Sequence, residues 1–593
     1  MVKSNEKPVP ETWLSSPNVS KDILAGFIVF LLALPLSIGI AMASGFPPLS
    51  GLAAAAIGGL IVAPFAGSPM SIKGPAAGMI VIMLGAVEEL GAGNNAAGVR
   101  YALAAVVVVG LIQILLGKFR LAEAGKAFPE ATVNGMLAAI GVIIISKQSH
   151  VMLGHVPSSK EPLKLLAEVP RAIMECNPQV AMVGVASLLL MVLWPMITRA
   201  KGMSFLSKIP VPLVVVFVAV ACSLGFDFAH AHEYTLLGAT HMIGPKFLVN
   251  VPSKITEAYI SPDFSLLGSG LWWKWAFMIG AVGSLESVLS VKAVDAIDPE
   301  KRHSDCSKDL MVVGFANTLC GLVGALPIIA EIVRSSANLN AGAKSRWANF
   351  FHGLFMVVFV AAFPWVINMI PLAALAGLLV FTGSRLAALS RCKAVFFAGK
   401  EQFAVFAITL VTTLATDLLV GIGVGLTCET VFNLLASGTL KHAFHPRIET
   451  TEATHAHPEK NEVTVIGVNS QLTFTNLMST MNHLKRVKAN HIVLDLTNSK
   501  FVDHTSMSAI SEFKDSLVGR SMDITGLDDM HAWSSHPHSA LIDKKSTFGR
   551  VITRPGRFQS NASTANPLEQ TVASGPLAGP LAEDASDVGK VIL

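Results

Sequence analysis

Charged residues are scarce in this sequence. Asp, Glu, Lys and Arg make up 14% of the 593 residues, compared with about 25% in an ordinary soluble domain. The formal net charge is only +4, so the chain offers no broadly basic surface for nucleic acid. Hydrophobic residues account for 52% of the chain. This composition predicts a protein that lies mostly within a lipid bilayer.

Cysteine and the usual catalytic patterns are sparse as well. The six cysteines are scattered, and none forms a CxxC pair or another metal-ligand spacing, so we expect free thiols. The sequence contains no nucleophile set, metal cluster or phosphate-binding loop, which argues against an enzyme. The polar N-terminus lacks the short apolar core and small-residue cleavage site of a secretory signal. We therefore expect the first hydrophobic run to remain as a helix.

Long hydrophobic runs fill most of the chain and fall into two sets of seven. In both sets the third run is interrupted, as expected of an inverted or parallel duplication in a membrane transporter. We predict a polytopic α-helical domain over residues 23–437, with repeats at about 23–226 and 271–437. The runs lie near residues 23–45, 50–66, 75–90, 100–117, 129–147, 178–198 and 210–225, and then near 271–294, 309–325, 333–343, 348–368, 370–387, 401–418 and 419–436.

The two interrupted runs carry the strongest functional signal. Pro327 and Gly342 enclose about three helical turns, well short of the ~20 apolar residues needed to span a bilayer. A half-helix at this depth leaves its first backbone N–H groups unpaired, and together with the helix dipole they form a positive end that can hold an anion. Arg334 adds a permanent cation, and the stretch 67–78 is broken in the same way. These features predict an anion transporter with its site at the bilayer midplane.

Loop charge and composition predict the topology and the remaining domains. Lys and Arg gather in alternate loops, which the positive-inside rule assigns to the cytoplasm together with residues 1–22 and the C-terminal part. Residues 438–462 form a polar linker in this interpretation, and alternating strand and helix patterns over 463–543 predict a small α/β domain. Residues 544–593 are rich in Pro, Gly, Ser and Ala, so we expect a disordered tail.

Several motifs resemble the SulP family of anion transporters, which includes sulfate permeases and bicarbonate transporters. The membrane motifs are LAGFIVFLLALPLSIGIAMASGFPPLSGL at 24–52, GSPMSIKGPAAG at 67–78, and SLES with DLMVVGFANTLCGLVGALP within 284–327. The stretch VLDLTNSKFVDHTSM at 493–507 resembles the STAS domain that follows the membrane region in this family. The likeness extends over about residues 22–542.

The resemblance implies a fold shared with uracil permeases. This fold is a seven-plus-seven inverted repeat with core and gate domains, followed by a small cytoplasmic α/β STAS domain, and substrate lies between the third and tenth segments. The resemblance also implies a bacterial cell inner membrane location, a homodimer, and a cytoplasmic partner of the STAS domain. Bacterial members take up substrate with sodium or protons, whereas some animal members exchange or conduct anions.

Glu286 is the candidate for cation coupling. It falls near the middle of a hydrophobic run, where an ionisable side chain is costly, and in the sodium-coupled bicarbonate transporters this position is an acidic cation ligand. Ser290 lies one turn later on the same helix face, so a carboxylate and a hydroxyl could hold Na⁺ there. Two alternatives stay open: Glu286 carries a proton, or it pairs with Arg334. Glu331 departs from the small or hydroxyl residues of the family, and we group it with the cation-coupling residues.

The candidate substrate-binding residues are small or polar and flank the two breaks. Small side chains let an oxyanion approach backbone N–H groups, while a guanidinium and hydroxyls donate hydrogen bonds. The alternative is that the serines cap the short helix. Lys73 is expected to be a cytoplasmic-loop charge, and Asn317 is as readily an interhelical hydrogen bond as a ligand. The candidates are Gly74, Pro75, Ala76, Ala77, Arg334, Ser335 and Ser336.

The C-terminal domain carries two weaker signals. Thr505 aligns with a hydroxyl that accepts phosphate in relatives of the STAS domain, although helix capping is the preferred interpretation. His531, His536 and His538 invite a metal, but their spacing is irregular and no cysteine lies nearby. We therefore predict no cofactor and no metal apart from Na⁺ or H⁺ as the coupling ion, with Na⁺ at Glu286.

The sequence thus predicts secondary active transport of a small inorganic oxyanion, bicarbonate or sulfate, by elevator-like motion of a core domain. Anion exchange is one alternative. A second is an anion sensor that signals through its C-terminal domain, which would bind ligand without transporting it. The third is a nucleobase permease on the same fold, in which Glu331 would face the base edges.

Overall fold

The chain forms two compact units, which are described separately. Among the described residues, the first unit holds 18–122 and 140–386, and the second holds 125–139 and 387–544. The computed structural model describes residues 18–122, 125, 128–159, 161–199, 206, 209–236, 239–251, 259–438, 443–453, 463–487, 489–515, 517, 519–528 and 530–544. The expected tail lies outside these residues except for Lys544.

Eight helical stretches of the described residues are long and apolar enough to cross a membrane. Four shorter apolar helices occupy the remaining uninterrupted runs, so the predicted polytopic helical architecture is confirmed. The long stretches are α1 (Val19–Ala43), α4 (Asn95–Lys118), α5 (Glu130–Leu153), α7 (Pro178–Arg199), α9 (Gly270–Ile297), α10 (Cys306–Val323), α14 (Leu372–Leu386) with α15 (Leu389–Ala398), and α17 (Leu418–Ser437). The shorter ones are α2 (Pro48–Ile57), which continues as a π-helix over Gly58–Val62, α8 (Val211–Gly225), α12 (Trp347–Ala362) and α16 (Lys400–Ala415).

The two interrupted runs each begin with a short strand. Strand β1 (Ile72–Gly74) leads into a 3₁₀ turn (Ala77–Met79) and α3 (Ile80–Gly91), and β4 (Ile329–Glu331) leads into α11 (Ile332–Asn340). The strands pair antiparallel, with Ile72 opposite Glu331 and Gly74 opposite Ile329. This pairing satisfies backbone groups that a broken helix would leave open in lipid.

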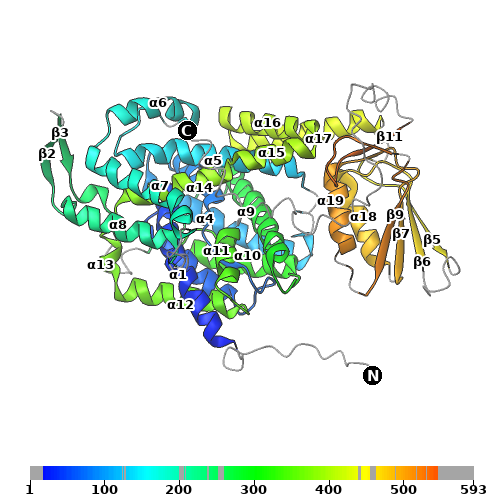
Figure 1. Ribbon diagram of the computed structural model, residues 1–593, viewed down its shortest axis with the longest axis horizontal. Coiled ribbons are helices and arrows are strands. Elements are labelled where there is room, and N and C mark those ends of the chain that lie inside the picture. The colour runs from blue at the N-terminus through cyan, green and yellow to red at the C-terminus, as the bar shows by residue number, and fades with distance from the viewer. Residues whose placement is uncertain are drawn as a thin grey trace. The chain divides into compact units, whose positions relative to one another are not determined.

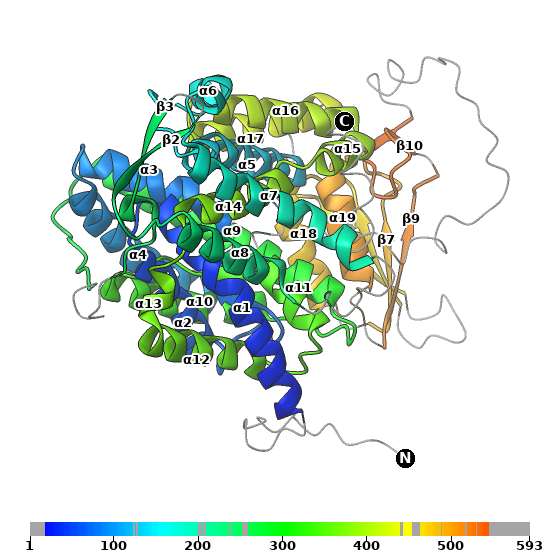
Figure 2. The same cartoon turned by 60° about the vertical axis from the view of Figure 1, so that its left-hand side comes forward.

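The first unit packs closely because small residues allow helices to approach. Helix α1 lies beside α12, and α4 lies beside α10 (Figure 2). Gly26 of α1 faces the backbone of Ala348, where any side chain would clash. Further along α1, Leu34 and Ile38 join Leu375 of α14 in one buried apolar cluster. These contacts place β1, β4 and α11 in the interior.

Two features of the first unit were not expected from the sequence. Helix α6 (Pro162–Met174) and a hairpin of β2 (His232–Leu236) and β3 (Ala239–Ile243) lie in the long loops, whereas α13 (Pro364–Ile367) lies within the run expected near 348–368. Helix α6 is amphipathic, so polar residues interrupt its apolar residues and the sequence contains no continuous apolar run there.

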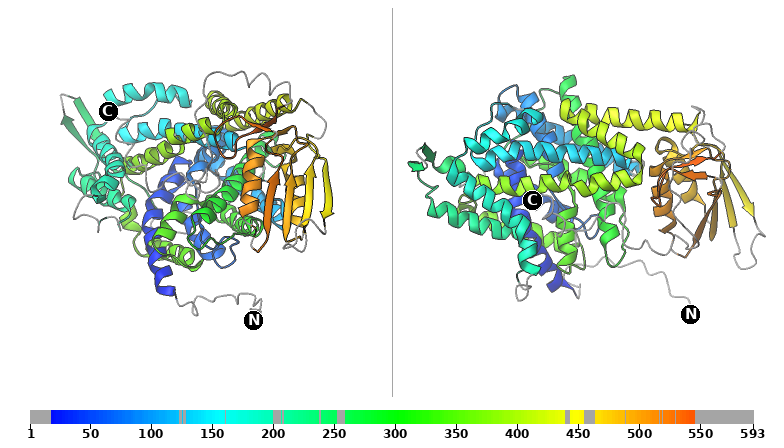
Figure 3. Two further views of the ribbon diagram at one scale, coloured as in Figure 1. Left: turned by 45° about the vertical axis from the view of Figure 1, so that its right-hand side comes forward. Right: turned by 45° about the horizontal axis from the view of Figure 1, so that its top comes forward.

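The second unit contains a mixed α/β region, as predicted. Its main sheet has the order β5-β6-β7-β9, in which the last three strands are parallel and β5 is antiparallel. Helices α18 (Phe474–Arg486) and α19 (His504–Asp515) cover one face of this sheet (Figures 1 and 3). The strands are β5 (Ile448–Ala453), β6 (Val463–Val468), β7 (His491–Asp495) and β9 (Ser521–Thr525), and a smaller sheet holds β8 (Phe501–Val502), β10 (Met530–Ala532) and β11 (Leu541–Asp543). Strand β5 lies within the residues expected to form a linker.

Candidate functional site

Arg334 lies at the centre of the candidate site. It is the third residue of α11 and is fully buried. Its Nη2 donates a hydrogen bond of 3.2 Å to the carbonyl oxygen of Pro75, whereas Nε and Nη1 have no hydrogen-bond partner in the described part of the chain. Buried donors without acceptors are costly, so these two atoms are suited to a bound anion.

Two glycines allow charged side chains to reach the start of the third segment. A methyl group on Gly74 would collide with Nη1 of Arg334, and a methyl group on Gly78 would collide with the carboxylate of Glu286. The site therefore brings Arg334 and Glu286, from the second half of the chain, against backbone from the first half. Gly74, Pro75, Ala76 and Ala77 are all buried beside them.

Ser335 connects the two breaks. Its hydroxyl accepts a hydrogen bond of 2.8 Å from the N–H of Ile72 and donates one to the carbonyl oxygen of Glu331. Ser336 is half-buried. Helix α11 begins at Ile332, and its N-cap residue is Glu331. Both serines lie inside the helix, so the alternative in which they cap it is wrong. The reason is that β4 runs directly into α11 and moves the helix start upstream of the serines.

Glu331 and Glu286 place carboxyl groups close to the buried guanidinium of Arg334. Glu331 is half-buried at the end of β4, within electrostatic reach of Arg334 and of the Ala77 N–H. Glu286 is half-buried in the middle of α9, and Ser290 is buried one turn later. Between them, the Ser287 hydroxyl accepts a hydrogen bond of 3.2 Å from the Ala330 N–H and fixes β4 to α9. This acidic side of the site could take a proton or a hard cation.

Lys73 is not a loop charge, so that prediction is wrong. Its Nζ lies 2.7 Å from Oδ2 of Asp309, in the first turn of α10, and 2.6 Å from the hydroxyl of Ser71. The second carboxylate oxygen of Asp309 accepts a hydrogen bond from the N–H of Ser68 at 3.0 Å. Lys73 is buried because β1 pairs in the interior and carries the side chain with it.

Asn317 and His352 are two further buried polar residues near the site. Asn317 Nδ2 donates to Gln113 Oε1 at 2.8 Å, and its Oδ1 accepts from the N–H of Ile328 at 2.7 Å. Asn317 therefore makes the interhelical hydrogen bond that was one of its two expected roles. His352 of α12 is fully buried and within electrostatic reach of Arg334. Sequence reasoning missed it, although a lone histidine in an apolar run is a usable signal.

The weaker signals of the α/β region have clear places in the second unit. Thr505 is buried inside α19, and the start of this helix is capped by Asp503, whose Oδ1 accepts a hydrogen bond of 2.8 Å from the N–H of Ser506. The expectation that Thr505 caps the helix is therefore wrong, because the helix begins one residue earlier. His531 is exposed, whereas His536 and His538 are half-buried. No three His, Cys, Asp or Glu side chains of the described residues are placed to hold a metal ion.

Comparison with known proteins identifies the family. A model of the sulfate permease family matches residues 19–409. The putative sulfate transporter YbaR of Bacillus subtilis is 25% identical to this protein, over 86% of this chain and 94% of its own length. The transmembrane domain of a cyanobacterium bicarbonate transporter, BicA, superposes with a TM-score of 0.55 at 20% identity, over 69% of this chain and 98% of that one.

A second solved structure extends the likeness to the C-terminal region. The murine Solute Carrier 26 family member A9 anion transporter in the inward-facing state gives a TM-score of 0.61 at 16% identity, over 86% of both chains. The mixed α/β region of the present chain is consistent with a STAS domain. The chain therefore belongs to the sulfate permease family, and it is a multi-pass membrane anion transporter with the Solute Carrier 26 fold rather than an enzyme.

Proposed function

We propose that this protein is a secondary active transporter of bicarbonate or sulfate in a bacterial inner membrane, coupled to Na⁺ or H⁺. The observation that carries the proposal is the environment of Arg334, whose buried guanidinium has Nε and Nη1 without partners among the described residues. A small oxyanion supplies the acceptor oxygens that these donors need. The names of the relatives, a putative sulfate transporter and a bicarbonate transporter, support the same class of substrate.

In this proposal the anion binds between the starts of α3 and α11. The small residues 74–77 admit it to the backbone, and Arg334 and Ser336 face it from the other side. Ser335 holds the two breaks together through its hydrogen bonds to Ile72 and Glu331. The identity of the substrate then depends on how many of its oxygen atoms can accept hydrogen bonds from Nε and Nη1 of Arg334 and from the backbone N–H groups.

The acids next to the site give a physical reason for coupling. An ionised Glu286 or Glu331 repels an anion, and the repulsion is strong where water is excluded. A proton or Na⁺ on this acidic side, with Ser290 as a further ligand, removes the repulsion. Cation and anion then bind more tightly together than either does alone, which is the coupling that symport requires.

The paired strands suggest how the site moves. Because β1 and β4 are hydrogen-bonded to each other, the two breaks move as one body. We infer that a core domain carries the site across the membrane against a gate domain, and that the two interrupted segments mark the inverted repeats. We also infer a homodimer with the C-terminal region in the cytoplasm, where it is available to a partner protein.

Uptake into proteoliposomes tests the proposal. Purified protein is supplied with labelled bicarbonate or labelled sulfate under an inward Na⁺ gradient, an inward H⁺ gradient or neither. We expect one anion to accumulate with one gradient, and Glu286→Gln to abolish the dependence on that gradient. The matched control is Glu233→Gln, which changes an exposed acid on β2 and should leave uptake unchanged.

The same vesicles separate the rival functions. Accumulation that needs a counter-anion inside but no cation gradient would indicate an exchanger. Folded protein that binds anion in a direct titration but moves none would favour a sensor. Uptake of labelled uracil but of neither anion would overturn the oxyanion proposal.

A further inference from the structure

In the second unit, α19 of the α/β region contacts the first residue of α5. His504 is buried, and its Nε2 lies 3.6 Å from Oε2 of Glu130. The hydroxyl of Ser508, one turn later on α19, donates a hydrogen bond of 3.2 Å to Oε1 of the same carboxylate. The other ring nitrogen of His504 lies 2.7 Å from the carbonyl oxygen of His538. Two side chains of α19 thus contact Glu130, and one of them can gain or lose a charge.

Other contacts join the α/β region to α15 and α17 without the side chain of His504. Asp503 accepts a hydrogen bond of 3.0 Å from Asn433 of α17, and Trp533 packs edge-on against Phe432 of α17 with ring centres 5.2 Å apart. The hydroxyl of Ser534 donates to the carbonyl oxygen of Ala398 at the end of α15. These contacts can keep the region attached when the contact with Glu130 is lost.

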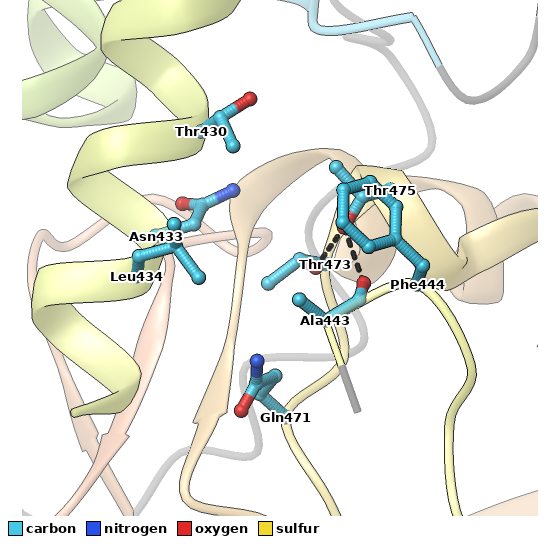
Figure 4. A pocket seen from close by; sticks show the side chains of 8 residues that line it. All are labelled: Thr430, Asn433, Leu434, Ala443, Phe444, Gln471, Thr473 and Thr475. Carbon is cyan, nitrogen blue, oxygen red and sulfur yellow. Dashed lines mark hydrogen bonds between the residues drawn. The ribbon is translucent and has the colours of Figure 1, made fainter. Parts of the chain in front are cut away.

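The packing beside α17 is incomplete. A small cavity separates Asn433 and Leu434 of α17 from Gln471 and Thr473 of the α/β region (Figure 4). A close-packed interface resists small displacements, whereas a cavity leaves room for them. The contact at His504 therefore lies in an interface that has space to adjust.

His504 is the centre of a cluster of titratable groups. Asp503 precedes it on the chain, Glu130 faces it from α5, and Glu401 of α16 and Glu429 of α17 are within electrostatic reach. On the remaining side the ring of His536 lies 5.3 Å from that of His504, and His538 lies beyond it. Four carboxyl groups, on α5, α16, α17 and the residue before α19, therefore interact with one imidazole, so the charge on His504 decides how strongly they repel one another.

We propose that His504 is a proton-operated latch between the α/β region and α5. When protonated, it holds Glu130 by an ion pair. When neutral, it gives up the ion pair and leaves Glu130 with the hydroxyl of Ser508, so the contact between the first turn of α5 and α19 loosens. The proposal concerns regulation by cytoplasmic protons and does not depend on which anion is carried.

The direction of titration agrees with this arrangement. Burial lowers the pKa of His504, but the hydrogen bond and charge of Glu130, with the carbonyl of His538 and the charge of Asp503, outweigh burial and raise it overall. The latch is therefore fully closed below the ordinary histidine pKa of about 6.5 and opens as pH rises through the higher value of the folded protein. Burial and the charges of His504 and His538 lower the pKa of His536 to about 4, and burial with the charge of His504 lowers the pKa of His538.

Hydrogen exchange of the full-length protein, followed by mass spectrometry from pH 6 to pH 9, tests the latch. Protection of the segments 130–139 and 504–515 is divided by the intrinsic exchange rate at each pH. We expect roughly a tenfold loss of protection in the wild type as pH rises. His504→Gln should show the low protection at every pH, and His504→Lys, which keeps the charge, should show the high protection at every pH.

Two further variants make the test specific. Glu130→Gln removes the anion of the pair and should match His504→Gln, which covers the case in which a substitution at the buried histidine disturbs folding. His531→Gln changes an exposed histidine of the same region and should follow the wild type. Wild-type protection that stays constant from pH 6 to pH 9, or a loss in His531→Gln equal to that in His504→Gln, would overturn the proposal.

Discussion

Lys73 and Asp309 form an ion pair that is sealed inside the protein. Nζ lies 2.7 Å from Oδ2, and the two side chains are 0% and 2% exposed. Each charge is stable in the interior because the other is present. We expect Asp309→Asn to cost about 3–5 kcal/mol of stability, because it leaves a buried ammonium without its partner. The thermal unfolding midpoint in detergent and the yield of folded protein measure this loss.

A double variant separates the charge from the shape of this pair. Lys73→Met with Asp309→Asn removes both charges, and it should recover most of the lost stability. Lys308→Met, at an exposed neighbour of Asp309, serves as the control and should unfold like the wild type. An Asp309→Asn protein as stable as the wild type would show that the pair is not needed.

Gly78 is expected to be needed for full transport activity. In Gly78→Ala the added methyl group meets the carboxylate of Glu286, and overpacking of this kind costs about 1–3 kcal/mol. We expect the initial rate of anion uptake to fall by about tenfold while the protein still elutes as a folded species. Gly423→Ala is the control, because a methyl group there meets no atom within 4 Å. Equal uptake by both variants would argue against the placement of Glu286.

Replacing Arg334 should weaken anion binding. Arg334→Gln removes a charged donor, and a hydrogen bond to a charged group contributes about 1.5–3 kcal/mol. We expect the KM for the anion to rise about ten- to hundredfold. Arg334→Lys keeps the charge but loses the planar arrangement of N–H donors, so its KM should lie between those of the wild type and Arg334→Gln. Arg171→Gln, at an exposed arginine, should leave the KM unchanged.

Asn317 is expected to stabilise the backbone at Ile328, the residue before β4. Asn317→Leu would leave the buried N–H of Ile328 without its acceptor, at a cost of about 1–3 kcal/mol. A lower thermal midpoint is the expected result. Asn340→Leu, at the exposed end of α11, provides the comparison. If the two variants have the same midpoint, the hydrogen bond to Ile328 contributes little.

The membrane helices could be predicted because their signal is local. A run of apolar residues near 23–45 is α1, and Pro327 with Gly342 marks a segment too short to cross, which is α11. The pairing of β1 with β4 could not be predicted, because each strand has three residues and its partner lies in the other half of the chain. Nothing in local periodicity identifies such a partner.

The sequence predicted several residues of the candidate site but not the contacts that these residues make. Gly74 and Arg334 were both chosen for anion binding, and the structure brings them together. Ser335 was chosen as a donor to substrate, yet its hydroxyl already donates to the carbonyl oxygen of Glu331. Lys73 was misassigned because burial of a charge depends on a partner, here Asp309, that sequence spacing does not reveal.

The pairing of β1 with β4 also has a consequence for biosynthesis. The first interrupted segment leaves the ribosome long before the second, and until β4 arrives the backbone of β1 has no partner in a medium without water. Each such group costs several kcal/mol in hydrocarbon. We therefore expect the first half of the chain to need shielding during membrane insertion, and a chain that stops before residue 329 to be unstable rather than half of a working protein.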